Sequence, residues 1–339
     1  MMRYFFFISI CLALTACAEQ KQPVENTVSD ACSYLNFKTP GNFQSAGVQM
    51  VTIDGKYKVW TKRFGNAPIK VLLLHGGPAM THEYMECFES FFPQAGIEFY
   101  EYDQLGSYYS DQPKDSSLWT TARFVEEVEQ VRKALGLNKD NFYILGNSWG
   151  GILAMEYALK YQENLKGLVV ANMTASIPKY AAYNKLLRSQ MRPSLIDSLS
   201  KFEAAGDYFN PVYTDLVVKE YYNKHICRLP EWPEAVNRSF KHVNQEVYVM
   251  MQGPSEFKVG GRLLHWDRWN DIKSIKVPAL MVGAKYDTMN PAEMEEMSKM
   301  APKGRYLYCP NGSHLAMWDD QEVFMDGVIQ FLKDVDASK

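Results

Sequence analysis

Short runs of consecutive apolar residues recur along this chain, and they constrain its fold more than any other feature. Residues 71–74, 142–145, 168–171 and 279–283 form such runs, and residues 97–103 repeat the type with acidic residues between the apolar ones. Strands at 48–53 and 57–64 around the turn Asp54-Gly55 precede them. Continuous apolar runs are typical of strands buried on both faces, as in a parallel sheet. Segments with helical periodicity, near residues 118–135, 150–161, 291–300 and 319–335, separate or follow them. This alternation predicts an α/β fold with a mostly parallel sheet flanked by helices.

A long interval without strand-like runs interrupts the alternation between residues 176 and 271. The interval is helix-like, rich in Tyr, Trp, Asn and charged residues, and repeatedly broken by proline. We expect a helical cap inserted after the sixth strand, lying over the carboxyl ends of the sheet, where open α/β sheets bind ligands. The core would then comprise residues 36–175 and 272–339.

The first 17 residues have the pattern of an export signal. Met1-Met2-Arg3 is positively charged, residues 4–13 are apolar but too few to span a bilayer, and Leu14-Thr15-Ala16-Cys17 resembles a lipobox. The resemblance implies a bacterial lipoprotein acylated at Cys17 and anchored to a membrane, in the periplasm or on the cell surface. An ordinary secretory signal with an incidental cysteine is the alternative. Both predict export, and residues 18–35 would form a flexible polar tether.

Charge and cysteine usage exclude several partners. The formal net charge of -3 offers no basic surface for phosphates, so we expect no nucleic-acid partner. Outside the signal segment, none of the four cysteines forms a C-x-x-C pair or lies near clustered histidines, so we expect no metal and no other cofactor. In an oxidising compartment, one or two disulfides could form among Cys32, Cys87, Cys227 and Cys309.

A serine between glycines marks the point where one predicted strand turns into a helix. In Gly146-Asn147-Ser148-Trp149-Gly150, the G-x-S-x-G pattern is that of a nucleophile elbow, a turn so tight that larger flanking side chains would collide. The turn raises the serine hydroxyl out of the sheet. Ser148 is therefore the candidate nucleophile, and it needs a base together with an acid that orients the base.

Both partners follow in the expected order, acid before histidine. Asp287 comes just after the apolar run 279–283, and His314 lies in a loop between the predicted strand 306–309 and the last helix. The segment His75-Gly76-Gly77-Pro78 follows another strand and exposes backbone N–H groups. We expect the N–H groups of Gly77 and Trp149 to form an oxyanion hole.

Six stretches resemble one family in collinear order: HGGPAMTHEY, YDQLGSYYSDQP, GNSWGGILAMEYA, MMQGPSEF, GAKYDTMNP and GSHLAMWDD. The family is that of the proline iminopeptidases and related tricorn-interacting aminopeptidases, which are capped serine hydrolases of the α/β-hydrolase fold. The resemblance extends over residues 48–332. It implies that Ser148, Asp287 and His314 are nucleophile, acid and base. It also implies cleavage of an N-terminal residue, often proline, from short peptides, or hydrolysis of amino-acid amides.

The resemblance also assigns a substrate-binding role to Glu256. In this family cap carboxylates bind the ammonium group of the substrate, and Glu256 matches one of them; a structural ion pair with a cap Lys or Arg is the alternative. Thr288 stands where one branch has a second acid. Tyr108 and Tyr109 replace smaller or polar family residues and could reshape the acyl-side pocket. A second acid could instead come from Glu231, Glu234 or Glu246.

The function implied is that of a serine aminopeptidase acting through an acyl-enzyme. The cap aromatics Trp232, Tyr248 and Phe257 would enclose the first side chain, unless they only pack the cap. A carboxylesterase or lactonase that uses the same triad is the alternative, and Glu256 would then be structural. A binding protein that keeps the fold without turnover is a third hypothesis.

Overall fold

The computed structural model describes residues 47–208, 210–256 and 258–338. The predicted signal segment 1–17 with Cys17 and the tether 18–35 lie outside the described residues, as do Cys32 and Phe257. No helix in the described ranges combines the length and apolar character needed to cross a bilayer.

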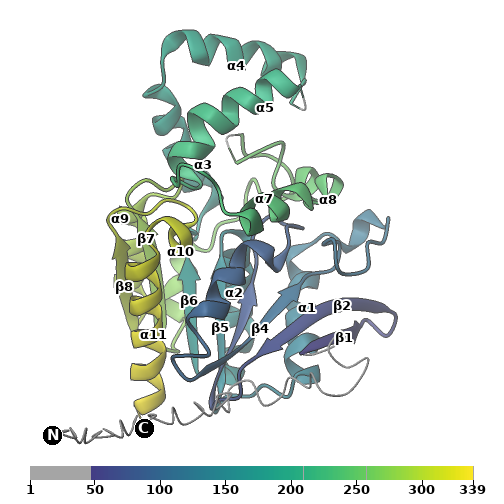
Figure 1. The fold of residues 1–339 in the computed structure, drawn as a ribbon, viewed down its shortest axis with the longest axis vertical. Helices are drawn as coiled ribbons and strands as arrows, with labels where there is room; N and C mark the ends of the chain where they lie inside the picture. Colours follow the sequence, from purple (N-terminus) through teal and green to yellow (C-terminus); the bar gives the residue numbers. More distant parts are fainter. Residues whose placement is uncertain (1–46, 209, 257, 339) are drawn as a thin grey trace, which may run out of the picture.

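An eight-stranded sheet forms the centre of the molecule (Figure 1). The strand order is β1-β2-β4-β3-β5-β6-β7-β8; β2 is antiparallel to both of its neighbours, and all other neighbouring strands are parallel. The mostly parallel α/β sheet is confirmed. The strands are β1 (Val48–Ile53), β2 (Tyr57–Phe64), β3 (Ile69–Leu74), β4 (Ile97–Asp103), β5 (Phe142–Asn147), β6 (Gly167–Ala171), β7 (Ala279–Ala284) and β8 (Gly304–Cys309).

Both faces of the sheet are covered by helices, which explains the unbroken apolar runs. Along β3, Val71 and Leu73 belong to one core and Leu72 and Leu74 to the other, because successive side chains of a strand point to opposite faces. Side chains of α1 (Thr121–Ala134), α2 (Trp149–Tyr161) and α9 (Pro291–Met300) fill one core. Side chains of η2 (His82–Ser90), α10 (Ala316–Asp319) and α11 (Gln321–Ala337) fill the other. Three short 3-10 helices connect elements: η3 (Ser116–Leu118), η4 (Gln162–Asn164) and η6 (Trp269–Ser274).

Local signals set the ends of these elements. Asp54 and Gly55 both adopt positive φ, 50° and 69°, as a tight hairpin turn requires. The side chain of Thr120 accepts a hydrogen bond from the Arg123 N–H at 3.3 Å, so α1 begins at Thr121, three residues later than the predicted start. The predicted final helix, 319–335, corresponds to α11, and the short helix α10 precedes it and ends at Asp319.

Among the described residues, seven helical segments lie between β6 and η6, and we refer to residues 176–271 as the cap. The cap rises above the carboxyl ends of the strands (Figure 1). Its two connections to the sheet run side by side, with Ser176 paired to Asp267 in an antiparallel bridge. The segments are α3 (Ile177–Ser189), α4 (Pro193–Ala205), α5 (Pro211–Val217), the π-helical η5 (Val218–Tyr222), α6 (Asn223–His225), α7 (Glu234–Lys241) and α8 (Gln245–Met251).

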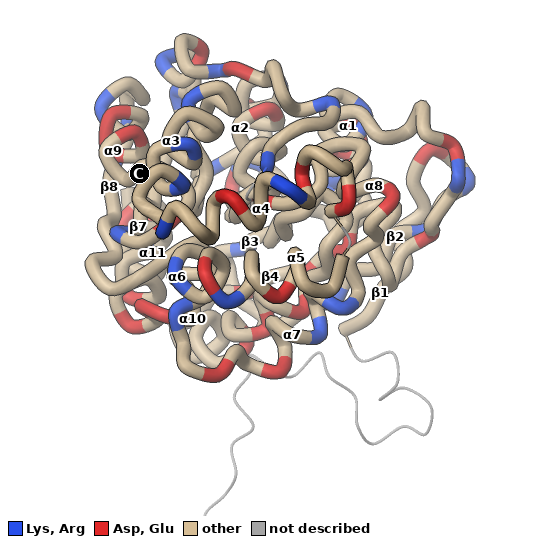
Figure 2. The backbone as a smooth tube through the Cα atoms, turned by 90° about the horizontal axis from the view of Figure 1, so that it is seen from above, with Lys and Arg blue, Asp and Glu red and all other residues tan. Residues whose placement is uncertain are grey.

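The outer part of the cap has a small apolar core of its own. Buried residues of α3, α4, α5 and η5 form a cluster separate from the two sheet cores; they are Leu187, Leu195, Leu199, Tyr213, Val217 and Tyr221. Seen from above, α4, α5 and α7 lie over the sheet, and positions of basic and acidic residues are interspersed along the backbone (Figure 2).

The described cysteines are not joined by disulfides. Cys87, Cys227 and Cys309 are free thiols and are buried.

Candidate active site

Ser148 occupies a strained turn between β5 and α2. Its backbone has φ 55° and ψ -127°, a region that costs a non-glycine residue about 1–3 kcal/mol. The positions flanking Ser148 need glycine because backbone atoms lie where a Cβ would be. A Cβ on Gly146 would overlap the carbonyl oxygen of Gly150, and a Cβ on Gly150 would overlap that of Leu74. The turn therefore has the backbone geometry that the G-x-S-x-G pattern predicts.

His314 and Asp287 form a buried hydrogen-bonded pair. The Nδ1 atom of His314 lies 2.8 Å from Oδ1 of Asp287. Because a carboxylate only accepts, neutral His314 carries its proton on Nδ1 and its lone pair on Nε2. Burial alone would lower the pKa of His314, but the charge of Asp287 and this hydrogen bond outweigh it and raise the pKa above 6.5.

The carboxylate of Asp287 accepts hydrogen bonds from two further donors. Nδ2 of Asn172 donates to Oδ2 at 2.7 Å, and the Thr288 hydroxyl donates to Oδ1 at 3.3 Å. Asn172 follows β6 and adopts φ 55°, a conformation that asparagine tolerates better than most residues. Asn172 was not among the residues predicted from the sequence. Its position directly after the carboxyl end of a buried strand is the signal that could have identified it.

One cavity brings four of the predicted site residues together. Ser148, His314, Gly77 and Glu256 all line a cavity of ≈ 640 Å³ between the sheet and the cap. Asp287 lies behind His314, outside the lining. Trp149 does not line the cavity with its side chain, which is buried and donates from Nε1 to Oε1 of Gln104 at 2.7 Å.

In the loop after β3, the N–H of Gly76 is hydrogen-bonded within the protein, and the N–H that follows it is a potential donor to substrate. The Gly76 N–H donates to the Tyr84 hydroxyl at 2.7 Å, and this hydroxyl donates to Oδ1 of Asn147 at 2.9 Å. The next N–H is that of Gly77, whose φ of 111° and close approach to Met80 exclude a side chain. The N–H of Trp149 is at the first turn of α2, where N–H groups lack intrahelical partners.

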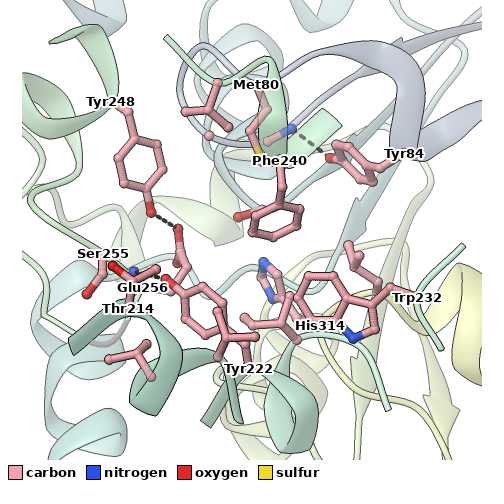
Figure 3. Close-up of a pocket in the computed structure, with 18 of the residues that line it drawn as sticks. Met80, Tyr84, Thr214, Tyr222, Trp232, Phe240, Tyr248, Ser255, Glu256 and His314 are labelled. Atoms are coloured by element: carbon pink, nitrogen blue, oxygen red, sulfur yellow. Dashed lines mark hydrogen bonds between the residues drawn. The ribbon is translucent and has the colours of Figure 1, made fainter. Parts of the chain in front are cut away.

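Glu256 is held by neutral donors and not by a cation. Its Oε1 accepts from the Tyr248 hydroxyl at 2.5 Å, and its Oε2 accepts from the Tyr180 hydroxyl at 2.9 Å. None of the ion pairs found among the described residues includes Glu256, so the alternative of a structural ion pair has no partner there. Figure 3 shows its carboxylate and the imidazole of His314 on the wall of the cavity, with Phe240 and Trp232 nearby.

The other acids considered from sequence point elsewhere. Glu234 pairs with Arg238 at 2.8 Å and Glu246 with Lys114 at 3.1 Å, and neither they nor Glu231 line the cavity. Glu256 is the single carboxylate among the described lining residues. Within the described ranges, no three His, Cys, Asp or Glu side chains form a group that could hold a metal.

One expectation about aromatic residues needs correction. Tyr108 and Tyr109 do not line the cavity: Tyr108 stacks on His242 with ring centroids 3.9 Å apart, and Tyr109 donates to Oε1 of Glu83 at 2.7 Å. Both tyrosines are exposed. Trp232 and Tyr248 do line the cavity, but the Tyr248 hydroxyl is committed to Glu256. The second tyrosine on this carboxylate, Tyr180, was missed because the contact depends on the folding of the cap.

Comparison with known proteins identifies the family. A family model described as alpha/beta hydrolase fold matches residues 70–321. A proline iminopeptidase of Flavobacterium johnsoniae is 66% identical over 294 residues, which are 86% of this chain and 99% of that protein. One of Chitinophaga pinensis is 50% identical over 295 residues, 86% of this chain and 99% of that protein. The crystal structure of the Mycobacterium smegmatis proline iminopeptidase has a TM-score of 0.78 at 30% identity and covers 85% of this chain and 98% of that one. The chain belongs to the proline iminopeptidase family of α/β hydrolases.

Proposed function

We propose that this protein is a serine aminopeptidase that releases an N-terminal residue, proline or another small or apolar residue, from short peptides, or hydrolyses amino-acid amides. The observation that carries the proposal is the shared cavity of Ser148, His314 and Glu256. A hydrolase that acted on neutral esters would have no use for a carboxylate there. A substrate with a free amino group supplies the cation that this carboxylate lacks.

In the proposed reaction, Ser148 attacks the carbonyl carbon of the first residue while Nε2 of His314 takes the hydroxyl proton. The N–H groups of Gly77 and Trp149 donate to the oxyanion that forms, and each such donor is worth about 3 kcal/mol in the transition state. When the C–N bond breaks, His314 returns the proton to the leaving nitrogen. A water molecule, deprotonated by His314, then cleaves the acyl-enzyme ester and restores the Ser148 hydroxyl.

The proposed part of Asp287 is to hold the imidazole. Its hydrogen bond fixes the Nδ1–H tautomer, and its charge stabilises the imidazolium that forms during both steps. Asn172 would in turn fix the carboxylate, and it acts only through Asp287.

Glu256 accounts for attack on the first peptide bond alone. The nitrogen and the carbonyl carbon of one residue are separated by only two bonds, N–Cα and Cα–C. A carboxylate that binds the terminal ammonium therefore fixes which carbonyl reaches Ser148. An acetylated N-terminus lacks the charge to bind in this way.

The test compares a proline or alanine arylamide with its N-acetylated counterpart in the wild-type protein and in Glu256→Gln. Removing one member of a buried charge pair costs about 2–5 kcal/mol, so kcat/KM on the free amine should fall at least about thirtyfold. A short acyl ester serves as control, because its hydrolysis needs Ser148 but no ammonium site. Equal rates on free and acetylated arylamides, with faster cleavage of the ester, would favour the carboxylesterase or lactonase alternative.

We also propose that the protein is exported as a bacterial lipoprotein, anchored in the periplasm or on the cell surface through acyl chains on Cys17. The proposal rests on the sequence Leu14-Thr15-Ala16-Cys17 after a short apolar segment. Expressed in bacteria, the wild-type protein should partition into detergent and have an acylated N-terminal cysteine by mass spectrometry. Cys17→Ser should abolish both properties and Cys11→Ser neither. An N-terminus that retains residues 1–16 would contradict the proposal.

A further inference from the structure

The lining of the cavity carries two opposite charges, both contributed by the cap. Besides the base His314, its charged residues among those described are Glu256 and Lys241. The remaining lining is neutral, and much of it is apolar or aromatic, including Met80, Trp232 and Phe240. A cavity with one anion and one cation fits a ligand with the opposite arrangement of charges.

The two charges lie at different depths. Glu256 is half-buried and receives hydrogen bonds from Tyr180 and Tyr248. Lys241 is exposed, at the end of α7, and two exposed amide side chains, Asn237 and Gln245, also line the cavity. Asn237 and Lys241 are four residues apart and so share one face of α7. Ammonium and amide N–H groups at the rim are donors suited to a carboxylate.

Lys241 differs from Arg238, the neighbouring cation of the same helix, in its ion pairs. Arg238 contacts three carboxylates, those of Glu83, Glu86 and Glu234, at 2.6–2.8 Å. The ion pairs found among the described residues do not include Lys241. The charge of Lys241 is therefore not committed to another side chain of the described structure, and it adjoins the space that substrate would occupy.

We propose that Lys241, with Asn237 and Gln245 beside it, binds the C-terminal carboxylate of the substrate, so that the preferred substrate is a peptide of one short length with both ends free. The inference rests on the proposed aminopeptidase function, because Glu256 must hold the ammonium end. With that end fixed and the first carbonyl at Ser148, the rest of the peptide leads towards the rim. An extended chain advances at most about 3.3–3.6 Å per residue, so only one short length places its carboxylate at Lys241.

The effect should be modest and dependent on salt. An exposed ion pair contributes about 0.2–1 kcal/mol, which corresponds to an affinity ratio of at most about fivefold. Salt screens such a pair much more than it screens the half-buried site of Glu256.

The experiment measures Kd for peptides of two, three and four residues, each as the free acid and as the amide, with Ser148→Ala as background so that no turnover is needed. The first residue is the one that the wild-type protein cleaves fastest as an arylamide. Variants are Lys241→Gln, Lys241→Arg and, as a matched control, Lys201→Gln, because Lys201 is an exposed cap lysine outside the cavity.

At one length, the free acid should bind about two- to fivefold more tightly than the amide at low salt. Lys241→Gln should abolish this preference, Lys241→Arg should keep it, and Lys201→Gln should leave it unchanged. An acid-to-amide ratio that is the same in Lys241→Gln and its background at every length would overturn the proposal. Turnover by the protein with intact Ser148 is measured separately. Peptides that bind with the expected preference but are not cleaved would refute the proposed function and leave the carboxylate site standing.

Discussion

The backbone N–H of His314 donates to the carbonyl oxygen of His225, 3.0 Å away, and this hydrogen bond joins the loop of the proposed base to the cap. Two more hydrogen bonds reinforce the junction, because the Leu315 N–H and the Ser313 hydroxyl both donate to the carbonyl oxygen of Ile226, at 2.8 and 2.9 Å. The position of the imidazole is thus set by the cap as well as by the sheet.

Replacing Ser313 by alanine tests this junction. The substitution leaves the buried carbonyl of Ile226 with one donor fewer and also removes a hydrogen bond to Asp319, so we expect a loss of about 1–3 kcal/mol of unfolding free energy. We also expect kcat to fall more than KM rises, because the base is displaced. Ser189→Ala is the matched control, since that exposed hydroxyl bonds only within its own helix, and it should change stability by less than about 0.5 kcal/mol. Unchanged kcat in Ser313→Ala would show that the junction does not position His314.

The pH dependence of activity should report the Asp287–His314 pair. In the proposed mechanism the base must be neutral, so kcat/KM should fall as pH decreases through the pKa of His314, which Asp287 holds above 6.5. In Asp287→Asn the charge is lost, and the acid limb should move to lower pH while kcat falls about 10⁴-fold. An acid limb at the same pH in both proteins would mean that another group controls it.

The glycines of the serine turn should not tolerate alanine. Because a Cβ on Gly146 would overlap a backbone oxygen, Gly146→Ala should lose more than about 4 kcal/mol or fail to fold. Gly260→Ala is the control, since its added Cβ would have no neighbour nearer than 3.6 Å, and it should cost about 1 kcal/mol or less. Urea unfolding followed by circular dichroism measures both. A Gly146→Ala protein as stable as wild type would contradict the crowding described here.

A buried acid beside the loop after β3 makes stability depend on pH. Burial raises the pKa of Glu101 to about 8, and neither of its carboxylate oxygens has a hydrogen-bond partner. Burial would lower the pKa of His82, but Asp103, 2.8 Å from its Nδ1, raises it to about 8. Above the unfolded pKa values, 4.5 for Glu101 and 6.5 for His82, the folded protein holds protons that the unfolded chain releases. Stability should therefore decline as pH rises towards about 8.

Glu101→Gln should flatten that decline, because the amide does not titrate. The remaining slope should begin near pH 6.5, the unfolded pKa of His82. Unfolding free energies measured in urea at several pH values give both slopes. An identical slope in the two proteins would show that Glu101 is ionised in the folded state.

The fold was predictable because a strand that is buried on both faces has consecutive apolar residues, such as Leu72 and Leu73, and these are visible in the sequence. The ends of elements were less predictable. The start of α1 depends on the Thr120 cap, and the break before α11 falls at Asp320, whose side chain accepts a hydrogen bond from the Asn311 N–H at 2.9 Å. Such tertiary contacts leave no periodic signal.

The residues of the candidate site also fall into two groups, those that the sequence predicts and those that it does not. Ser148, Asp287 and His314 could be chosen from sequence because each follows a predicted strand, and the carboxyl ends of parallel strands share one edge of a sheet. Residues that contact one another only because the cap is folded could not be predicted from the sequence. Tyr180 reaches Glu256 from a helix far along the chain, and Tyr109 turns to Glu83, which sequence alone does not place beside it.

The most direct test of the central claim is covalent labelling of the folded protein with a fluorophosphonate, with the modified peptide identified by mass spectrometry. We expect a single adduct on Ser148, formed slowly or not at all in His314→Ala and absent in Ser148→Ala. A folded wild-type protein that is not labelled, or is labelled at another residue while Ser148→Ala keeps full activity, would contradict the assignment of Ser148 as the nucleophile.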